Sequence, residues 1–132
     1  MAGYIQTSKT DDYATPKDLY EQLNNEFHFD FDPCPLNADF DGLAIIWGGK
    51  VNFVNPPYSN LKAWIKKSFE ESQKGKTVVM LIPSRTDTIA FHEYIYHKAE
   101  IRFIKGRLKF SNKGPAPFAS MIVIFRGVNN GN

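Results

Sequence analysis

The chain has 132 residues, of which 42% are hydrophobic and 14% aromatic, and its formal net charge at pH 7 is +2. This length predicts one domain, and the apolar content excludes a disordered chain. The mild positive charge permits contact with a phosphate backbone without demanding it. One cysteine, Cys34, excludes an internal disulfide framework and is typical of a reducing cytosol. We expect neither a membrane span nor a signal peptide, because no apolar run approaches about 18 residues and no charged-then-apolar leader is present.

The N-terminal part of the chain predicts a tail and then a helix. Residues 1–12 are polar and unpatterned, so we expect a tail there, a domain over 13–126 and a second tail over 127–132. Thr15-Pro16 is typical of a helix start, with Thr15 as the cap and Pro16 at the first helical position. Leu19 and Leu23 mark one apolar face of this helix, which is expected to end near Phe27.

Residues 27–33 alternate between aromatic and polar side chains, which predicts a strand with Phe27, Phe29 and Phe31 on one face. The strand is expected to end at Asp32-Pro33, and an aspartate at this place is by itself an ordinary turn residue. Residues 37–50 are rich in Asp, Asn and Gly, and they predict one minor strand within residues 43–47 and two turns.

Residues 51–54 predict a short strand that stops in the turn Asn55-Pro56-Pro57-Tyr58. Asn55 is therefore expected at the carboxyl end of a strand, where open α/β sheets place their ligand sites. An exocyclic amine on an aromatic ring is a poor nucleophile, but two acceptors that bond both amine hydrogens localise its lone pair. The Asn55 side chain and the Pro56 carbonyl are candidates for these acceptors, Pro57 stiffens the turn, and Tyr58 is a candidate for stacking on the ring. The alternative is a plain strand-ending turn, in which Asn and Pro are common.

The second half of the chain predicts two helices and three strands. We expect an amphipathic helix over 60–74, a strand buried on both faces over 77–82, a helix over 86–98, and strands over 101–104 and 121–125. Arg85 follows the buried strand, where a phosphate contact and a solvated surface position are both open alternatives. Residues 105–118 interleave basic and aromatic side chains, which suits an extruded base and its phosphates; the alternative is a hairpin whose phenylalanines reinforce the core.

The turn at Asn55 carries a resemblance to a known family. Asn55-Pro56-Pro57-Tyr58 resembles the (D/N/S)-P-P-(Y/F) motif of amino methyltransferases that use S-adenosylmethionine. Further motifs extend this resemblance from Tyr13 to Phe125, and they point to the small phage-type DNA adenine-N6 methyltransferases, a Dam-like family. These motifs are Thr15-Pro16, Phe29-Asp30-Phe31-Asp32, Trp64, Leu81-Ile82-Pro83, Asp87-Thr88, Phe91-His92, Gly106-Arg107-Leu108 and Phe110.

The resemblance implies a single-domain α/β fold of the Rossmann-like methyltransferase type. Its sheet is expected to be mostly parallel with an antiparallel edge made by the last two strands, and no separate target-recognition domain is expected. The implied cofactor is S-adenosylmethionine without a metal, and the implied partner is double-stranded DNA in the cytoplasm of a bacterial host, if the chain is phage or prophage encoded. The sequence permits an oligomer but does not indicate one.

The resemblance also assigns site residues. Catalytic roles fall to Asn55, Pro56, Pro57 and Tyr58, and cofactor contacts to Thr15, Pro16, Asp32, Pro33 and Asn55. Contacts with the target base and DNA fall to Tyr58, Phe110, Arg85, Arg107 and Lys109. The sequence departs from the common methyltransferase pattern after Asp32, because prolines stand where a glycine-rich turn usually approaches the cofactor.

Two alternatives remain open from the sequence. The first is an enzyme of the same fold that methylates another amine, such as a protein glutamine, an RNA base or cytosine. The second is a catalytically degenerate nucleic-acid-binding module, which the missing glycines favour and the intact turn at Asn55 disfavours.

Overall fold

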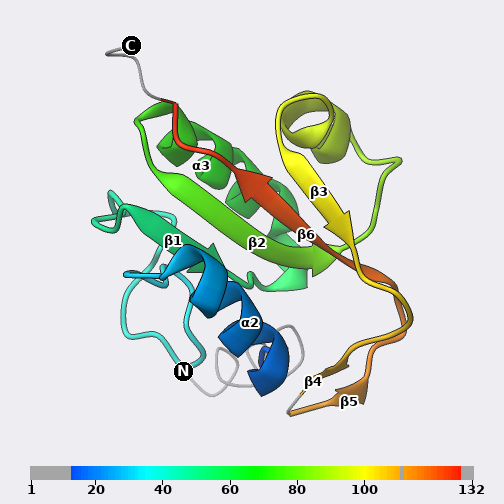
Figure 1. The fold of residues 1–132 in the computed structure, drawn as a ribbon. Coiled ribbons are helices and arrows are strands. Elements are labelled where there is room, and N and C mark those ends of the chain that lie inside the picture. The colour runs from blue at the N-terminus through cyan, green and yellow to red at the C-terminus, as the bar shows by residue number, and fades with distance from the viewer. Residues whose placement is uncertain (1–12, 111, 129–132) are drawn as a thin grey trace.

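The central element is a four-stranded mixed sheet with the strand order β1-β2-β6-β3. The computed structural model describes residues 13–110 and 112–128, so most of the two predicted tails, residues 1–12 and 129–132, lies outside the described residues. The strands are β1 (Val51–Val54), β2 (Thr77–Pro83), β3 (Glu100–Phe103) and β6 (Ser120–Phe125). β1 pairs parallel with β2, whereas β6 runs antiparallel to both β2 and β3 (Figure 1).

This topology confirms the α/β class and corrects one expectation. The last two strands, β3 and β6, are antiparallel as expected. The sheet is not mostly parallel in its pairings, however, because β6 is inserted between β2 and β3 and makes two antiparallel pairings beside one parallel pairing. Three strands still share one direction, so the carboxyl ends of β1, β2 and β3 meet at one end of the sheet.

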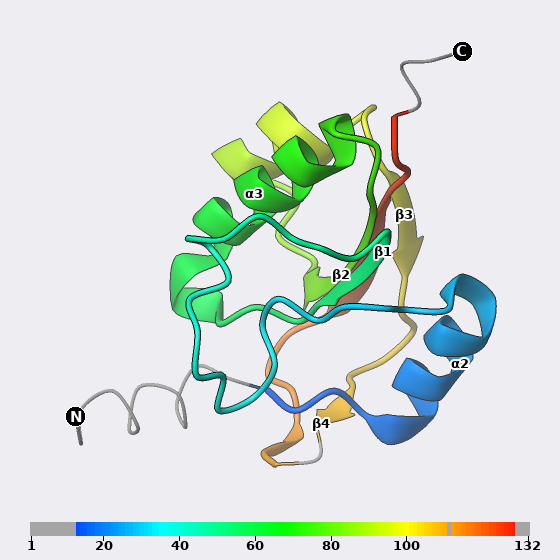
Figure 2. The same cartoon turned by 90° about the vertical axis from the view of Figure 1, so that its left-hand side faces the viewer.

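Helices cover both faces of the sheet, which gives three layers (Figure 2). α2 (Lys17–Phe27) packs on one face, and α3 (Leu61–Gln73) packs with η2 (Phe91–Ile95) on the other. β2 supplies alternate side chains to the two layers: Met80 faces α3, and Val79 and Leu81 face α2. The continuous apolar run therefore forms a strand buried on both faces, as predicted.

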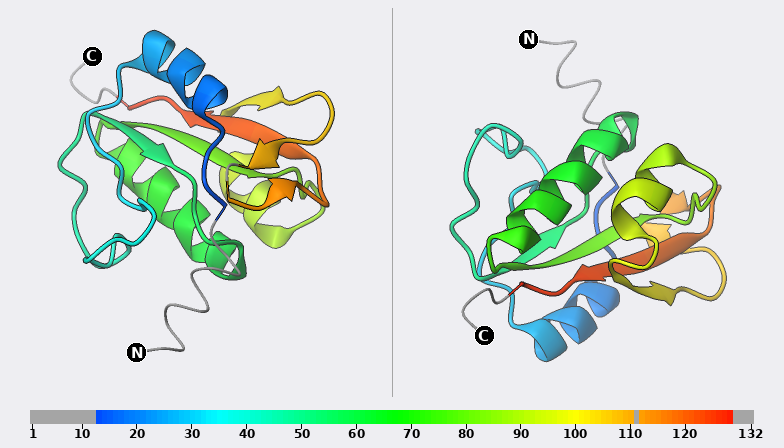
Figure 3. Two further views of the ribbon diagram at one scale, coloured as in Figure 1. Left: turned by 90° about the horizontal axis from the view of Figure 1, so that it is seen from below. Right: turned by 90° about the horizontal axis from the view of Figure 1, so that it is seen from above.

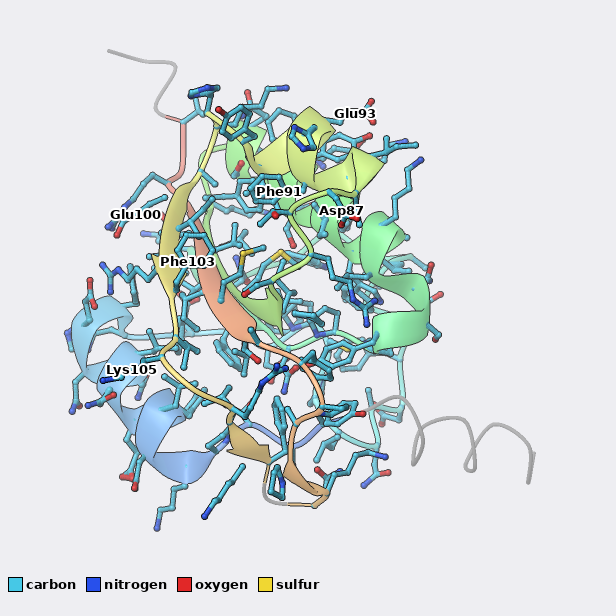
Figure 4. All side chains as sticks on the ribbon, turned by 90° about the vertical axis from the view of Figure 1, so that its right-hand side faces the viewer. Asp87, Phe91, Glu93, Glu100, Phe103 and Lys105 are labelled. Atoms are coloured by element: carbon cyan, nitrogen blue, oxygen red, sulfur yellow. The ribbon has the colours of Figure 1, made fainter. Side chains whose placement is uncertain are left out.

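The helix expected over 86–98 is shorter in the structure. Its regular part is η2, a π-helical turn, and it stops because Tyr96 is extended and His97 has a left-handed φ of 63°. Figure 4 shows this element beside the edge strand β3, and Phe91 is its buried anchor at 6% exposure. The edge strand carries the charges of Glu100 and Arg102, which form an ion pair at 2.8 Å and disfavour pairing with another chain.

Two strands predicted in the first half are absent from the described residues. Residues 27–33 are not a strand, because α2 continues to Phe27 and His28 then turns with a left-handed φ of 57°. One parallel bridge joins Phe31 to Asn52, and the aromatic face is split, since Phe29 packs in the α2 layer and Phe31 in the α3 layer. Residues 43–47 are also irregular, and Trp47 Nε1 donates to the Gly42 carbonyl at 2.8 Å within this loop.

A small hairpin completes the fold. β4 (Lys109–Phe110) and β5 (Gly114–Pro115) form a separate two-stranded sheet. The segment that enters α2 runs beside this hairpin at one end of the main sheet (Figure 3). The hairpin thereby closes the end of the sheet at which β1 and β2 finish.

Candidate active site

The candidate site lies where three chain segments meet beyond the carboxyl end of β1. Asn55 follows the last residue of β1, and the prolines after it delay the next helical turn, η1 (Tyr58–Asn60). Pro57 is extended, with a φ of −64° and a ψ of 136°, so it holds the chain open between the strand and the helix. Residues 13–16 and the β4–β5 hairpin complete the site from far away in the sequence.

Asn55 is fixed by hydrogen bonds to the segment before α2. Its Nδ2 donates to the Tyr13 carbonyl and, at 2.9 Å, to Thr15 Oγ1. Because a backbone carbonyl only accepts, these contacts set the orientation of the amide, and Oδ1 faces away from the segment. Thr15 was predicted to cap α2, but the N-cap residue is Pro16 and makes no side-chain cap hydrogen bond.

Asn55 Oδ1 is the chemically informative atom of the site. Asn55 Oδ1 is buried and finds no hydrogen-bond partner within residues 13–110 and 112–128. An unsatisfied buried acceptor costs about 1–3 kcal/mol, so this oxygen favours a ligand that brings a donor. An amine with two hydrogens is such a donor, which is the chemistry that the turn predicts.

Aromatic rings gather next to Asn55. Tyr58 stacks on Tyr13 with ring centroids 4.7 Å apart and an interplanar angle of 17°. Phe118 meets Tyr58 edge-on at 5.1 Å and Tyr13 edge-on at 5.6 Å. Burial raises the pKa of the Tyr58 phenol, and its oxygen lacks a hydrogen-bond partner among the described residues. Tyr58 therefore offers a ring face, not a proton donor or base.

Phe110 combines the two roles that the sequence left open. It is only 2% exposed and packs with Phe53 and Leu81 in the α2 layer, so it reinforces the core. Its ring also meets Tyr13 edge-on at 4.9 Å, so it borders the aromatic cluster. Tyr13 and Phe118 were not among the predicted site residues. The available signals were the position of Tyr13, two residues before the Thr-Pro motif, and the place of Phe118 in the basic and aromatic segment 105–118.

Asn55 also lines a cavity of about 390 Å³. Three predicted cofactor residues line it, namely Thr15, Asp32 and Asn55, whereas Pro16 and Pro33 are not among the described residues that do. Pro33 is buried, and its carbonyl lies against Gly42, where a Cβ would come within 1.9 Å. The remaining wall is made by Tyr13, Ala14, Lys17, Tyr20, Cys34, Pro35, Leu36 and Phe53.

Asp32 is the acidic group of this cavity. Its Oδ1 accepts a hydrogen bond from the Cys34 amide at 2.8 Å. This short aspartate turn takes the place of the glycine-rich turn of other methyltransferases, which the sequence lacks. Burial raises the pKa of Asp32 to about 6, against a weaker lowering by the Cys34 amide. Lys17 supplies a cation to the same cavity, so its wall can bind a ligand that carries both hydroxyl donors and a carboxylate.

The predicted DNA-contacting cations lie on exposed positions. Arg85 follows β2, and its positive charge lies near enough to act on the Tyr58 phenol. Arg107 is exposed on the segment that leads into the β4–β5 hairpin, and Lys109 is exposed on β4 itself. Among the described residues, His, Cys, Asp and Glu form no group that would hold a metal ion. No helix in the described parts of the chain is long and apolar enough to cross a membrane.

The fold and the site together define a class of protein. The mixed α/β sheet is compatible with a methyltransferase fold, and at a strand end Asn55 lines a cavity and bonds to Tyr13 of an aromatic cluster. A family model described as DNA N-6-adenine-methyltransferase (Dam) matches residues 3–130. The chain therefore belongs to this family, and the expected reaction class, adenine-N6 methylation of DNA, is confirmed by that membership.

Two phage proteins are similar to the chain. Over 128 residues it is 28% identical to the DNA N-6-adenine-methyltransferase of Haemophilus phage HP1 (strain HP1c1), which covers 85% of this chain and 74% of that protein. Over 108 residues it is 26% identical to the DNA N-6-adenine-methyltransferase of Escherichia phage T1, which covers 73% of this chain and 45% of that protein. The chain thus spans about three quarters of the first relative and less than half of the second.

Proposed function

We propose that this protein transfers a methyl group from S-adenosylmethionine to the exocyclic amine of an adenine that is rotated out of duplex DNA. The observation that carries the proposal is the buried oxygen of Asn55, which has no hydrogen-bond partner among the described residues; Asn55 also lines the cavity and bonds to Tyr13 of the aromatic cluster. We further propose that the four-stranded sheet is the Rossmann-like sheet of a methyltransferase, with β6 as its reversed strand.

The residues that line the cavity fit this cofactor. The partly buried carboxylate of Asp32 suits the ribose hydroxyls, which are donors, and Lys17 suits the carboxylate of the methionine portion. Tyr20 and Phe53 supply apolar wall for a flat ring. When bound, S-adenosylmethionine supplies an electrophilic methyl group on a sulfonium, so the transfer requires no metal.

The turn at Asn55 orients the amine. Asn55 Oδ1 and the Pro56 carbonyl accept the two amine hydrogens, which localises the nitrogen lone pair and points it toward the cavity. The Asn55 amide needs little reorganisation, because Tyr13 and Thr15 already hold its nitrogen. Bringing the amine into line with the methyl group is mainly a positioning effect. No dedicated base is required, since the methylated amine can release its proton to water.

DNA reaches the site from the side of the exposed cations. Inside a duplex the exocyclic amine of adenine is engaged in pairing, so the base must leave the stack to enter a pocket. Tyr58 and Phe110 are proposed to border the ring position, and the exposed side chains of Arg85, Arg107 and Lys109 are proposed to contact backbone phosphates.

The test is methyl transfer from labelled S-adenosylmethionine to unmethylated duplex DNA, followed by nucleoside analysis. We expect label in N6-methyladenine with the wild-type protein, and a loss of at least a hundredfold with Asn55→Ala while cofactor binding changes by only a few-fold. Asn55→Asp keeps an acceptor and is expected to retain part of the activity.

Asn60→Ala is the matched control. Asn60 is an exposed asparagine five residues further along, and as the N-cap residue of α3 it makes no side-chain cap hydrogen bond. We expect its substitution to leave transfer unchanged. Equal loss of transfer and cofactor binding in Asn55→Ala would refute the role of Asn55. Label in protein, RNA or cytosine instead of DNA adenine would refute the substrate, and absence of cofactor binding in the wild type would favour a non-catalytic module.

A further inference from the structure

We infer that the ring of Tyr13 stands in the slot of the target adenine, so that this ring must withdraw before a base can enter, while the Tyr13 carbonyl and Thr15 keep hold of Asn55. This inference deepens the proposed function and rests on it. The proposed function places the base against Tyr58 and Phe110, and the structure places another flat ring there. Tyr13 is then a surrogate for the substrate that closes the base slot until DNA displaces it.

The ring of Tyr13 is stacked in the way expected of a bound base. Its ring lies nearly parallel to Tyr58, at 4.7 Å and 17°, a separation and angle that suit a stacked aromatic ligand. The edge contact with Phe110 at 4.9 Å comes from a different segment, so the ring lies between the two residues assigned to the base. Phe118 contacts both Tyr13 and Tyr58 and completes the enclosure. Two rings cannot share one face of Tyr58, so Tyr13 and an adenine exclude each other.

The hydrogen bonds of Asn55 fit the same interpretation. In the closed arrangement the Asn55 amide nitrogen is engaged by the Tyr13 carbonyl and Thr15, while Oδ1 is left buried among the described residues without a partner. The tyrosine ring carries no amine, so it fills the slot without donating a hydrogen bond to that oxygen. An adenine satisfies both the ring position and the oxygen, which favours its entry over the return of Tyr13.

The closing segment is also attached to the hairpin that is proposed to meet DNA. The Ala14 amide donates to Asn112 Oδ1 at 2.8 Å, and Lys113 Nζ lies 5.1 Å from the centre of the Tyr13 ring. Asn112 and Lys113 belong to the connection between β4 and β5. Phosphates that approach this connection attract Lys113, so DNA binding weakens one of the contacts that hold the slot closed.

The consequence is measurable as an affinity. If the slot is open in about one molecule in ten, the apparent affinity for a flipped base is reduced about tenfold relative to a permanently open slot. Tyr13→Ala removes the occupant and is expected to lower the KM for duplex DNA about tenfold, measured at saturating cofactor. Tyr13→Phe keeps a ring in the slot and is expected to restore the wild-type KM. Tyr96→Ala, which truncates an exposed tyrosine far along the chain, is the control.

Steady-state methylation of unmethylated DNA with labelled S-adenosylmethionine separates the outcomes. An unchanged or raised KM in Tyr13→Ala would overturn the inference while leaving the proposed function intact, provided that the wild type methylates adenine. A raised KM for DNA together with weaker cofactor binding in Tyr13→Ala would also overturn it, because Tyr13 would then act through the cofactor cavity, whose wall it shares. Absence of transfer by the wild type would overturn the proposed function and this inference together.

A second measurement does not depend on the folding of a variant. With 3-fluorotyrosine at position 13 of the otherwise unchanged chain, the fluorine resonance is expected to be displaced by the ring currents of Tyr58 and Phe118. Saturating duplex DNA with S-adenosylhomocysteine is expected to move the resonance toward that of free 3-fluorotyrosine. A resonance that stays in place while the labelled protein still methylates DNA would show that Tyr13 does not leave the slot.

Discussion

Asp32→Asn should make the protein more stable and should weaken its binding of the cofactor. Burial raises the pKa of Asp32 to about 6 in the folded protein, against 3.8 as its ordinary value. The folded state thus binds this proton more tightly, so the contribution of Asp32 to stability is fully present below pH 3.8 and is lost as the pH rises toward 6. The rise of the pKa from 3.8 to about 6 corresponds to about 3 kcal/mol, which is the penalty for the ionised carboxylate at pH 7.

Asparagine cannot ionise and keeps an oxygen for the Cys34 amide, so it removes the penalty with little change of shape. From the same shift we expect Asp32→Asn to raise the free energy of unfolding by about 3 kcal/mol at pH 7 and by only about 1 kcal/mol at pH 4.5. Cofactor affinity should fall about tenfold at pH 7, because a hydrogen bond to a charged group is worth about 1.5–3 kcal/mol. One substitution thereby moves stability and binding in opposite directions.

Urea denaturation at the two pH values and cofactor titration by calorimetry check this prediction. Asp39→Asn, at an exposed position of the same loop, is the control and should change neither quantity. A gain in stability that is equal at pH 4.5 and pH 7 would show that ionisation of Asp32 is not its cause. Unchanged cofactor affinity would remove Asp32 from the proposed cofactor site.

Other substitutions separate the site from the framework. Glu71→Gln should lower the free energy of unfolding at pH 7 by about 3 kcal/mol in urea denaturation. Burial alone would raise the Glu71 pKa, but hydrogen bonds from three lysines lower it to about 2. This stability is therefore present above pH 4.5 and is lost as the pH falls toward 2. Tyr58→Phe should keep methyl transfer within a few-fold and stabilise the fold by up to about 1 kcal/mol, since it removes a hydroxyl without a partner in the described structure. Tyr58→Ala should abolish transfer. Activity in Tyr58→Ala would refute the stacking of Tyr58 on the target base. Lys109→Ala should reduce the slope of log affinity for DNA against log salt by about 0.9, and Lys66→Ala, at an exposed position of α3, should leave it unchanged; equal slopes for Lys109→Ala and the wild type would exclude a phosphate contact.

Local patterns predicted the parts of the fold that depend on neighbours in sequence. α3 and β2 follow from helical periodicity and a continuous apolar run, and Asn55 follows from prolines that end a strand. The strand predicted over 27–33 failed because alternation alone does not supply a pairing partner along its length. Only Phe31 bridges to β1, and the helix before it continues to Phe27.

The rest of the site depends on contacts that no local pattern carries. Thr15 has the sequence of a helix cap, yet its hydroxyl accepts from Asn55, 40 residues away. Tyr13 contacts Tyr58 and Phe110, which are far from it in the sequence, so no periodic pattern predicts the position of its ring. The sequence predicted Asp32 as a cofactor residue, with an ordinary turn residue as the alternative. Its raised pKa comes from burial, which only the packed structure reveals.

The reversed strand explains why the site assembles at this end of the sheet. β3 runs parallel to β1 and β2 and therefore finishes at the same end as Asn55. β6 begins at that end, because Ser120 pairs with Pro83 at the carboxyl end of β2. The connection between β3 and β6, which contains the β4–β5 hairpin, thus starts and finishes at the end of the sheet where Asn55 lies. A parallel last strand would begin at the opposite end of the sheet and would require a crossover that carries this connection away from the strand ends. Inserting β6 antiparallel instead delivers Phe110, Phe118 and the basic segment to the amine-binding turn without any additional domain.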